Sequence, residues 1–194
     1  LTEDTFLNFN YTPVNALAKE SEDSLWAVSP PSNAVQRVEM TPDGPVAAEL
    51  VPTGSWPTSV AIWGDYVLVA QSGRDSLGFL SRSSRRIVDA IRVGNEPADI
   101  VVDGDVAYVT LSGADRVVRV DLVARMVTGS VEVPREPRAM AFDPIHKRLF
   151  VASSLSSNAT PRGPLQEVPI PVEDQHDVAV IDTEAFEFVA WTAP

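Results

Sequence analysis

The sequence contains no cysteine and only two histidines in its 194 residues. The lack of cysteine excludes disulfides, thiol chemistry, cysteine-ligated zinc, iron–sulfur clusters and covalent c-type haem attachment within this segment. Two histidines allow few Ser-His-Asp triads, and no Gly-x-Ser-x-Gly motif is present. A P-loop and a dinucleotide-binding fingerprint are also missing. We therefore expect no cofactor within this segment, and the sequence does not decide whether the chain is an enzyme.

Basic residues and long apolar runs are also scarce. Lysine and arginine total 15 against 27 aspartates and glutamates, and the formal net charge is -12. The cations are scattered and are not interleaved with aromatic residues, which argues against nucleic acid as a partner. The longest apolar runs are far shorter than the roughly 20 residues of a transmembrane helix. We therefore expect no transmembrane segment.

What the sequence does contain is an internal repeat. Pro57, Pro97 and Pro137 follow one another at intervals of 40 residues, and a similar apolar pattern comes after each of them. Pro13 begins a fourth, less regular unit. A repeat of this length indicates one supersecondary unit that is stacked several times. The predicted repeats are about 13–56, 57–96, 97–136 and 137–194, within a single structural segment.

Each unit contains four short apolar or alternating runs that are separated by turn residues, which predicts four antiparallel strands. Such a sheet cannot bury both faces alone, and radial stacking of four-stranded sheets gives an all-β fold, the β-propeller. The second run, for example 106–110, is the most apolar and is expected to be a central strand covered on both faces. The fourth run, for example 85–89, is charged, as an outer edge should be.

The run Val106-Ala107-Tyr108-Val109-Thr110-Leu111, followed by Asp115 to Asp121, resembles the YVTN-type β-propeller repeat. The resemblance covers essentially the whole chain, although Leu111 stands where that family usually has asparagine. Family members usually close with about seven blades of about 40 residues, so this chain would cover about four blades of a larger ring. Residues 5–10 align with the fourth strand of a unit and would be the outer strand of a preceding blade. A four-bladed ring and a dimer of half-rings are the alternatives.

The resemblance also implies a setting and a set of functions. Members are commonly secreted, periplasmic or at the cell surface, and the leading interpretation is a non-catalytic binding or scaffold module. Its partner would be another protein or the remainder of the propeller, and the sequence identifies no small-molecule ligand. The alternative is the propeller portion of a larger enzyme. That enzyme would be a redox protein with c-type or di-haem groups in a linked domain, or a lactonase-like hydrolase using a divalent cation.

The repeat is interrupted once, by an insertion at 155–177 before the third strand of the fourth unit. Long loops on a rigid scaffold often carry binding residues, so this loop is expected to cover one mouth of the propeller channel. A surface excursion without function is the alternative. Residues adjacent in an extended segment point alternately to opposite sides, which disfavours a metal site there. The candidate binding residues in the loop are Arg162, Glu173, Asp174, His176 and Asp177.

Charged residues also recur at the joints between units, where they are candidates for lining the channel or the joint: Glu96, Arg135, Glu136 and Arg138. Recurrence by repeat favours a structural role, and joint charges are usually solvated. The turn aspartates Asp75 and Asp115 are expected to bond nearby backbone amides, because aspartate commonly does so in turns.

Overall fold

The structure is a computed structural model that describes residues 13–154 and 178–191. It confirms an all-β fold, with four antiparallel sheets of four strands each, which we name blades A to D. Blade A holds β1 (Leu17–Ser21), β2 (Ser24–Ser29), β3 (Ala34–Thr41) and β4 (Gly44–Pro52). Blade B holds β5 (Pro57–Trp63), β6 (Tyr66–Gln71), β7 (Ser76–Ser81) and β8 (Arg86–Arg92). Blade C holds β9 (Pro97–Asp103), β10 (Val106–Leu111), β11 (Arg116–Asp121) and β12 (Met126–Glu132). Blade D holds β13 (Pro137–Asp143), β14 (Arg148–Ser153), β15 (Val178–Asp182) and β16 (Glu187–Trp191).

Within each blade the strands pair in chain order, so the second and third strands are central and the first and fourth are edges. The second strands β6 and β10 are almost entirely buried, and Val109 at the middle of β10 has no exposed surface. In the fourth strands β8 and β12, exposed residues occur along most of the length and are interspersed with half-buried ones. The order of strands that the sequence predicted within a blade is therefore confirmed.

Side chains of a central strand alternate between the two faces of its blade, and the hydrophobic core lies between blades as a result. On β6, Val67 and Val69 pack in the cluster shared with blade A, whereas Leu68 and Ala70 pack in the cluster shared with blade C. A third cluster joins blades C and D through Tyr108 and its neighbours. Each blade is thus stabilised mainly by the blades on either side of it.

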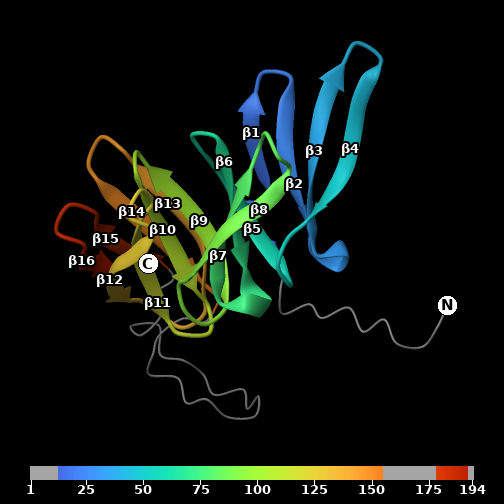
Figure 1. Cartoon of the computed structure of the whole chain (residues 1–194). Coiled ribbons are helices and arrows are strands. Elements are labelled where there is room, and N and C mark those ends of the chain that lie inside the picture. Colours follow the sequence, from blue (N-terminus) through green and yellow to red (C-terminus); the bar gives the residue numbers. More distant parts are fainter. Residues whose placement is uncertain (1–12, 155–177, 192–194) are drawn as a thin grey trace, which may run out of the picture.

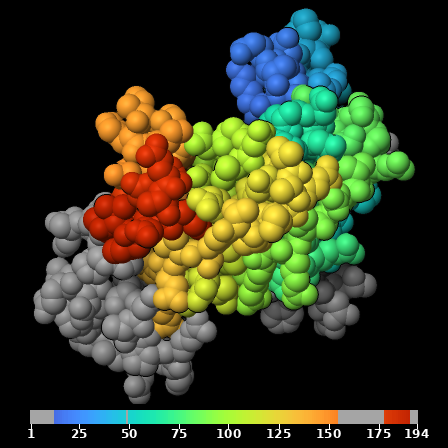
Figure 2. All heavy atoms as spheres, turned by 60° about the vertical axis from the view of Figure 1, so that its left-hand side comes forward, coloured from blue at the N-terminus to red at the C-terminus, as the bar shows by residue number. Residues whose placement is uncertain are grey.

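The four blades follow one another in an arc (Figure 1), and the space-filling view shows blade A projecting at one end (Figure 2). The first strands lie innermost, because β1 packs against β5, β5 against β9, and β9 against β13. The joints between blades and the turns between second and third strands share one edge of the arc, which we call the joint rim. The turns between first and second strands and between third and fourth strands form the opposite edge, which we call the hairpin rim.

A repeated backbone lock holds the joint rim. Asp75 and Asp115 end the turns after β6 and β10 with positive φ values of 55° and 54°. The Asp75 carboxylate accepts from the backbone N–H of Glu96 at 3.2 Å, and the Asp115 carboxylate accepts from that of Glu136 at 3.0 Å. These aspartates do bond backbone amides, but the prediction that the amides are nearby is wrong, because each amide is 21 residues further along the chain. In the same way, the Asn33 side-chain oxygen accepts from the backbone N–H of Trp56 at 2.9 Å.

Candidate functional site

The innermost strands β5 and β9 and the segment just before β1 bring three polar side chains together on the inner side of the arc. Asn15, Ser59 and Asp99 each stand two residues after the proline that begins a sequence unit. The Asn15 Nδ2 donates to both Asp99 oxygens at 2.7 and 2.9 Å, and the Ser59 hydroxyl donates to Asp99 Oδ1 at 3.0 Å. The backbone N–H groups of Ile100 and Met140 complete the set, each at 2.8 Å. One carboxylate therefore connects residues from all four blades.

Asp99 is a fully buried acid whose two oxygens accept five hydrogen bonds. Burial raises the pKa of Asp99 above its usual value, while the bonds from Met140 N–H and Asn15 act in the opposite direction. Since the protein itself occupies both carboxylate oxygens, the arrangement suits a structural hub better than an acid–base catalyst. Thr110 extends the hub: its hydroxyl accepts from the Asp99 N–H at 2.9 Å and donates to the Arg138 carbonyl at 3.0 Å.

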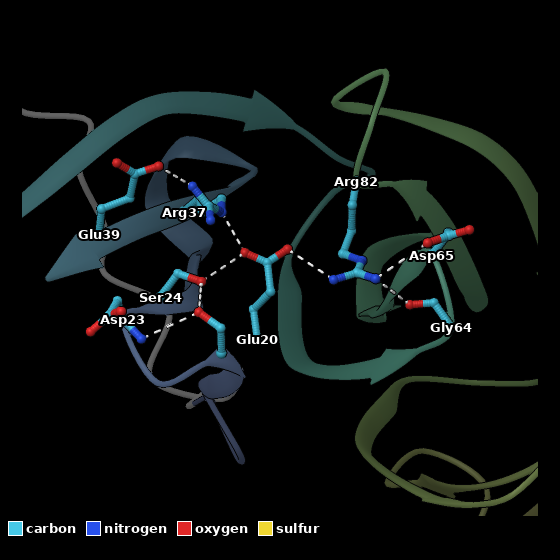
Figure 3. Close-up of polar contacts among 9 residues, drawn as sticks. Glu20, Asp23, Ser24, Arg37, Glu39, Gly64, Asp65 and Arg82 are labelled. Atoms are coloured by element: carbon cyan, nitrogen blue, oxygen red, sulfur yellow. Dashed lines mark hydrogen bonds and ion pairs between the residues drawn. The ribbon is translucent and has the colours of Figure 1, made fainter.

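A second polar cluster lies between blades A and B, on β1 and the hairpin rim (Figure 3). Glu20 accepts from the Arg37 guanidinium and from the Ser24 hydroxyl at 3.0 Å. Arg82 of blade B bonds the other Glu20 oxygen at 3.2 Å and the Gly64 carbonyl at 2.7 Å. Burial acts to raise the pKa of Glu20, but the hydrogen bonds led by Arg37 outweigh it and lower the pKa to about 2. Glu20 is therefore ionised at neutral pH, and it links blades A and B through its bonds to Arg37 and Arg82.

The predicted joint residues Glu96, Arg135, Glu136 and Arg138 lie on the joint rim. Glu96 and Glu136 have positive φ values of 54° and 53°, and both are half-buried. Ser112 donates to the Glu96 carbonyl through its N–H at 2.9 Å and its hydroxyl at 3.0 Å. Arg135 is buried, so the expectation that joint charges are solvated is wrong at that position, and Arg138 is half-buried.

The remaining predicted positions lie outside the described residues: the strand at 5–10 and the loop residues Arg162, Glu173, Asp174, His176 and Asp177. The two ends of that loop, Ser153 and Val178, are on the joint rim by topology, because β14 and β15 are the second and third strands of blade D. Within the described ranges, no three His, Asp or Glu side chains gather as metal ligands. No helix in the same ranges is long and apolar enough to cross a bilayer.

The two terminal blades carry apolar residues on their outward faces. Leu25 of blade A corresponds in register to Val67 of blade B, and Phe150 of blade D corresponds to Tyr108 of blade C. Val67 and Tyr108 are buried, whereas Leu25 and Phe150 are only half-buried. Further apolar residues on the same outward faces are at least partly exposed: Leu17, Ala27, Val38 and Leu50 on blade A, and Ala141, Ala152, Val178 and Val180 on blade D. On blade A the polar residues Lys19 and Gln36 lie among them, opposite Leu25 and Ala27.

These blades, joined face to face in an arc, define a β-propeller segment of about four blades. Comparison with solved structures shows the same fold in propeller-like proteins. Hydrazine synthase from Kuenenia stuttgartiensis matches with a TM-score of 0.74 and 18% identity over 98% of this chain. Apo AztD from Citrobacter koseri matches with a TM-score of 0.59 and 17% identity over 93% of this chain. Glutaminyl cyclase from Myxococcus xanthus matches with a TM-score of 0.52 and 14% identity over 70%.

Identities this low establish the fold alone. The chain spans 52% of the hydrazine synthase chain, 47% of the AztD chain and 66% of the glutaminyl cyclase chain. No protein-family model matches the sequence, and a search of curated proteins gives no match.

The Asp99 hub and the Glu20 cluster were not anticipated from the sequence. A signal for the first was present, because Asp99 is an acid within the apolar run that forms the innermost strand. Asn15 and Ser59 occupy the same position of their own units. Polar residues that recur at the same position of successive repeats, within an apolar run, indicate side chains that contact one another on the inner side of the arc.

Proposed function

We propose that this chain is a non-catalytic scaffold or binding segment of a β-propeller whose outward faces on blades A and D dock further protein. The observation that carries the proposal is the repeat correspondence described above. Positions that are buried between middle blades are apolar and partly exposed on the terminal blades. Apolar residues that are exposed together on one face often mark an interaction site.

The occupant we propose is the remainder of a propeller ring, in the form of further blades packed on the same faces. The geometry of the three existing interfaces supports this choice, because a further blade would repeat a contact that the arc already makes three times. The resemblance to YVTN-type repeats supports a ring of about seven blades in a secreted, periplasmic or surface assembly. The partial coverage of the structural neighbours fits the same picture.

The saturation of the inner polar residues supports the non-catalytic part of the proposal. Asp99 is a fully buried acid on the innermost strand β9, and both of its oxygens are engaged by protein donors. A general base needs a lone pair within reach of a substrate proton. In this chain that lone pair is already used.

The alternative is the propeller portion of an enzyme, since hydrazine synthase and glutaminyl cyclase are among the structural neighbours. A redox assembly would carry haem in a linked domain, and a lactonase-like hydrolase would hold a divalent cation. Natively purified material with a visible haem spectrum would favour the first, and a bound metal ion detected by elemental analysis would favour the second. Colourless, metal-free material that contains only further propeller repeats is the result that the scaffold proposal expects.

The docking faces are tested with Leu25→Glu, Phe150→Glu and the matched control Val67→Glu. We expect the 194-residue chain to self-associate in sedimentation experiments and to bind a hydrophobic dye. The two outward-face variants should keep the melting temperature nearly unchanged and reduce both signals. Val67→Glu should unfold the chain, because it buries an unpaired charge between blades. If Leu25→Glu unfolds the chain as Val67→Glu does, or if the wild type neither associates nor binds dye, the docking proposal is wrong.

A further inference from the structure

A groove of about 310 Å³ lies between blades A and B, on the outer side of their contact. The end of β4 and the joint after it form one wall, and the other is formed by β8, the turn before it, the end of β6 and the turn that follows β6. β4 packs beside β8 at this place, so the groove belongs to the interface between the blades. The residues that line it are Pro52, Thr53, Gly54, Gln71, Arg74, Arg85, Arg86, Ile87 and Ala90.

Three of the lining residues are arginines whose side chains have no partner in the part of the chain that the structure describes. Among the described residues, the side chains of Arg74, Arg85 and Arg86 make no ion pair, hydrogen bond or ring contact. Most other described cations differ in this respect. The following residues all pair with carboxylates: Lys19, Arg37, Arg82, Arg92, Arg116, Arg125, Lys147 and Arg148. In a chain of net charge -12, the concentration of unpaired arginines at one groove is a specific feature.

A buried amide adds a fourth donor. Gln71 is 1% exposed, and its Oε1 accepts from the Ser76 hydroxyl at 2.8 Å, which orients the amide. Its Nε2 makes no hydrogen bond with the described residues, and it is not one of the buried side-chain nitrogens that lack a partner, which are Trp26 Nε1 and Arg82 Nε. The amide nitrogen is therefore open to an acceptor at the groove that Gln71 lines.

Two glycines make room for this amide. A Cβ at Gly54 would lie 2.6 Å from Gln71 Oε1, and a Cβ at Gly78 would lie 2.4 Å from Gln71 Nε2. Real Cβ atoms do not approach other atoms so closely, so any side chain at either position would displace the glutamine. The backbone on both sides is thus shaped around a polar group that faces a groove lined with cations.

We propose that this groove binds a small polyanion that carries carboxylate or phosphate groups. Guanidinium groups present paired N–H donors that match the oxygens of both groups, and such charge-assisted bonds are stronger than neutral ones. The volume is at the lower end of the range for small-molecule pockets, which suits a metabolite-sized ligand rather than a polymer.

The positions of the arginines favour a ligand with more than one anionic group. Arg74 belongs to the short 3-10 helix η3 (Ser72–Arg74) on the joint rim, whereas Arg85 ends the turn before β8 and Arg86 begins β8, both at the hairpin rim. The strand β7 separates the two turns, so the cations approach the groove from its two ends. An isolated monoanion would engage one end only.

The experiment titrates the 194-residue chain at low ionic strength with citrate and, separately, with pyrophosphate, using calorimetry and thermal melting. We expect saturable binding of at least one of them, weakened at least tenfold by R74Q/R86Q. The variant Ala90→Phe places a ring in the groove without changing the charge and should weaken binding as much. Ala90 is exposed, so this variant should fold, which circular dichroism checks.

The matched control is K19Q/R116Q, which removes two exposed cations that do not line the groove. It should bind like the wild type. Binding of citrate alone would assign the site to carboxylates, and binding of pyrophosphate alone would assign it to phosphates. If neither anion binds at millimolar concentration, or if K19Q/R116Q loses as much affinity as R74Q/R86Q, the proposal is wrong. This test does not depend on ring completion or on the scaffold function.

Discussion

Asp99→Asn is the substitution that most directly tests whether one carboxylate holds the four blades in order. The exchange hardly changes the size of the side chain, so it creates no cavity. It replaces one acceptor oxygen by an NH2 group that faces donors. In the less costly orientation the NH2 takes the place of Oδ2, which accepts from Met140 N–H at 2.8 Å and from Asn15 Nδ2 at 2.9 Å. Two hydrogen bonds are then lost, and donors face one another.

Hydrogen bonds to a charged group contribute roughly 1.5–3 kcal/mol each, so the loss of two costs about 3–6 kcal/mol. The neutral side chain avoids the desolvation cost of a buried charge, which offsets part of this loss, so we expect a net destabilisation of about 2–4 kcal/mol. For a chain of this size, each kcal/mol lowers the melting temperature by roughly 2–4 °C, which gives a decrease of about 4–16 °C.

Differential scanning calorimetry at neutral pH measures this decrease. Asp105→Asn is the control, because Asp105 is exposed and accepts a single side-chain bond, from Trp63 Nε1 at 3.1 Å. That variant should melt within about 2 °C of the wild type, as surface substitutions usually do. An Asp99→Asn protein that melts as close to the wild type as Asp105→Asn does would refute the hub, and the blades would then be ordered by apolar packing alone.

Two further predictions concern packing and charge at other places in the arc. Val109→Asp should abolish soluble folding, because Val109 is fully buried and the new charge has no partner, and a wild-type-like melting curve would contradict the strand order. The lowered pKa of Glu20 makes its ionised form stabilising above its usual pKa of 4.5, and this contribution is lost as the pH falls towards about 2. Glu20→Gln should therefore show a weaker loss of stability over that pH range in acid titrations followed by circular dichroism, and an unchanged pH profile would rule out this role.

The repeat made the strands predictable, because each strand has its own hydrophobic pattern and each pattern depends on local burial. Val109 illustrates this: an apolar residue within an apolar run is read correctly as central without any knowledge of its neighbours. Asp99 was not predictable in the same way. Its partners Asn15 and Met140 are 84 and 41 residues away, and only the curvature of the arc brings them together.

The arginines of the groove show a second limit of sequence reasoning. Arg85 and Arg86 were interpreted as the charges expected on an exposed edge strand, and they do lie at that edge. Their significance depends on Gln71 and on the joint at 52–54, which reach the same groove from another strand and another blade. A pattern within one repeat cannot reveal a site that is formed between two repeats.

The terminal faces give the converse case, in which one pattern has two structural outcomes. Leu25 and Val67 occupy the same position of their blades and are both apolar, yet only Val67 is covered. Both residues are apolar and occupy the same place in the alternation of their strands. Their difference in exposure therefore comes from the presence or absence of a neighbouring blade. If apolar residues at this position serve only the blade itself, a charge at Leu25 should be as disruptive as a charge at Val67. If they serve the contact between blades, the charge at Leu25 should leave the segment folded and remove only its association, which is why this pair of variants separates blade stability from ring assembly.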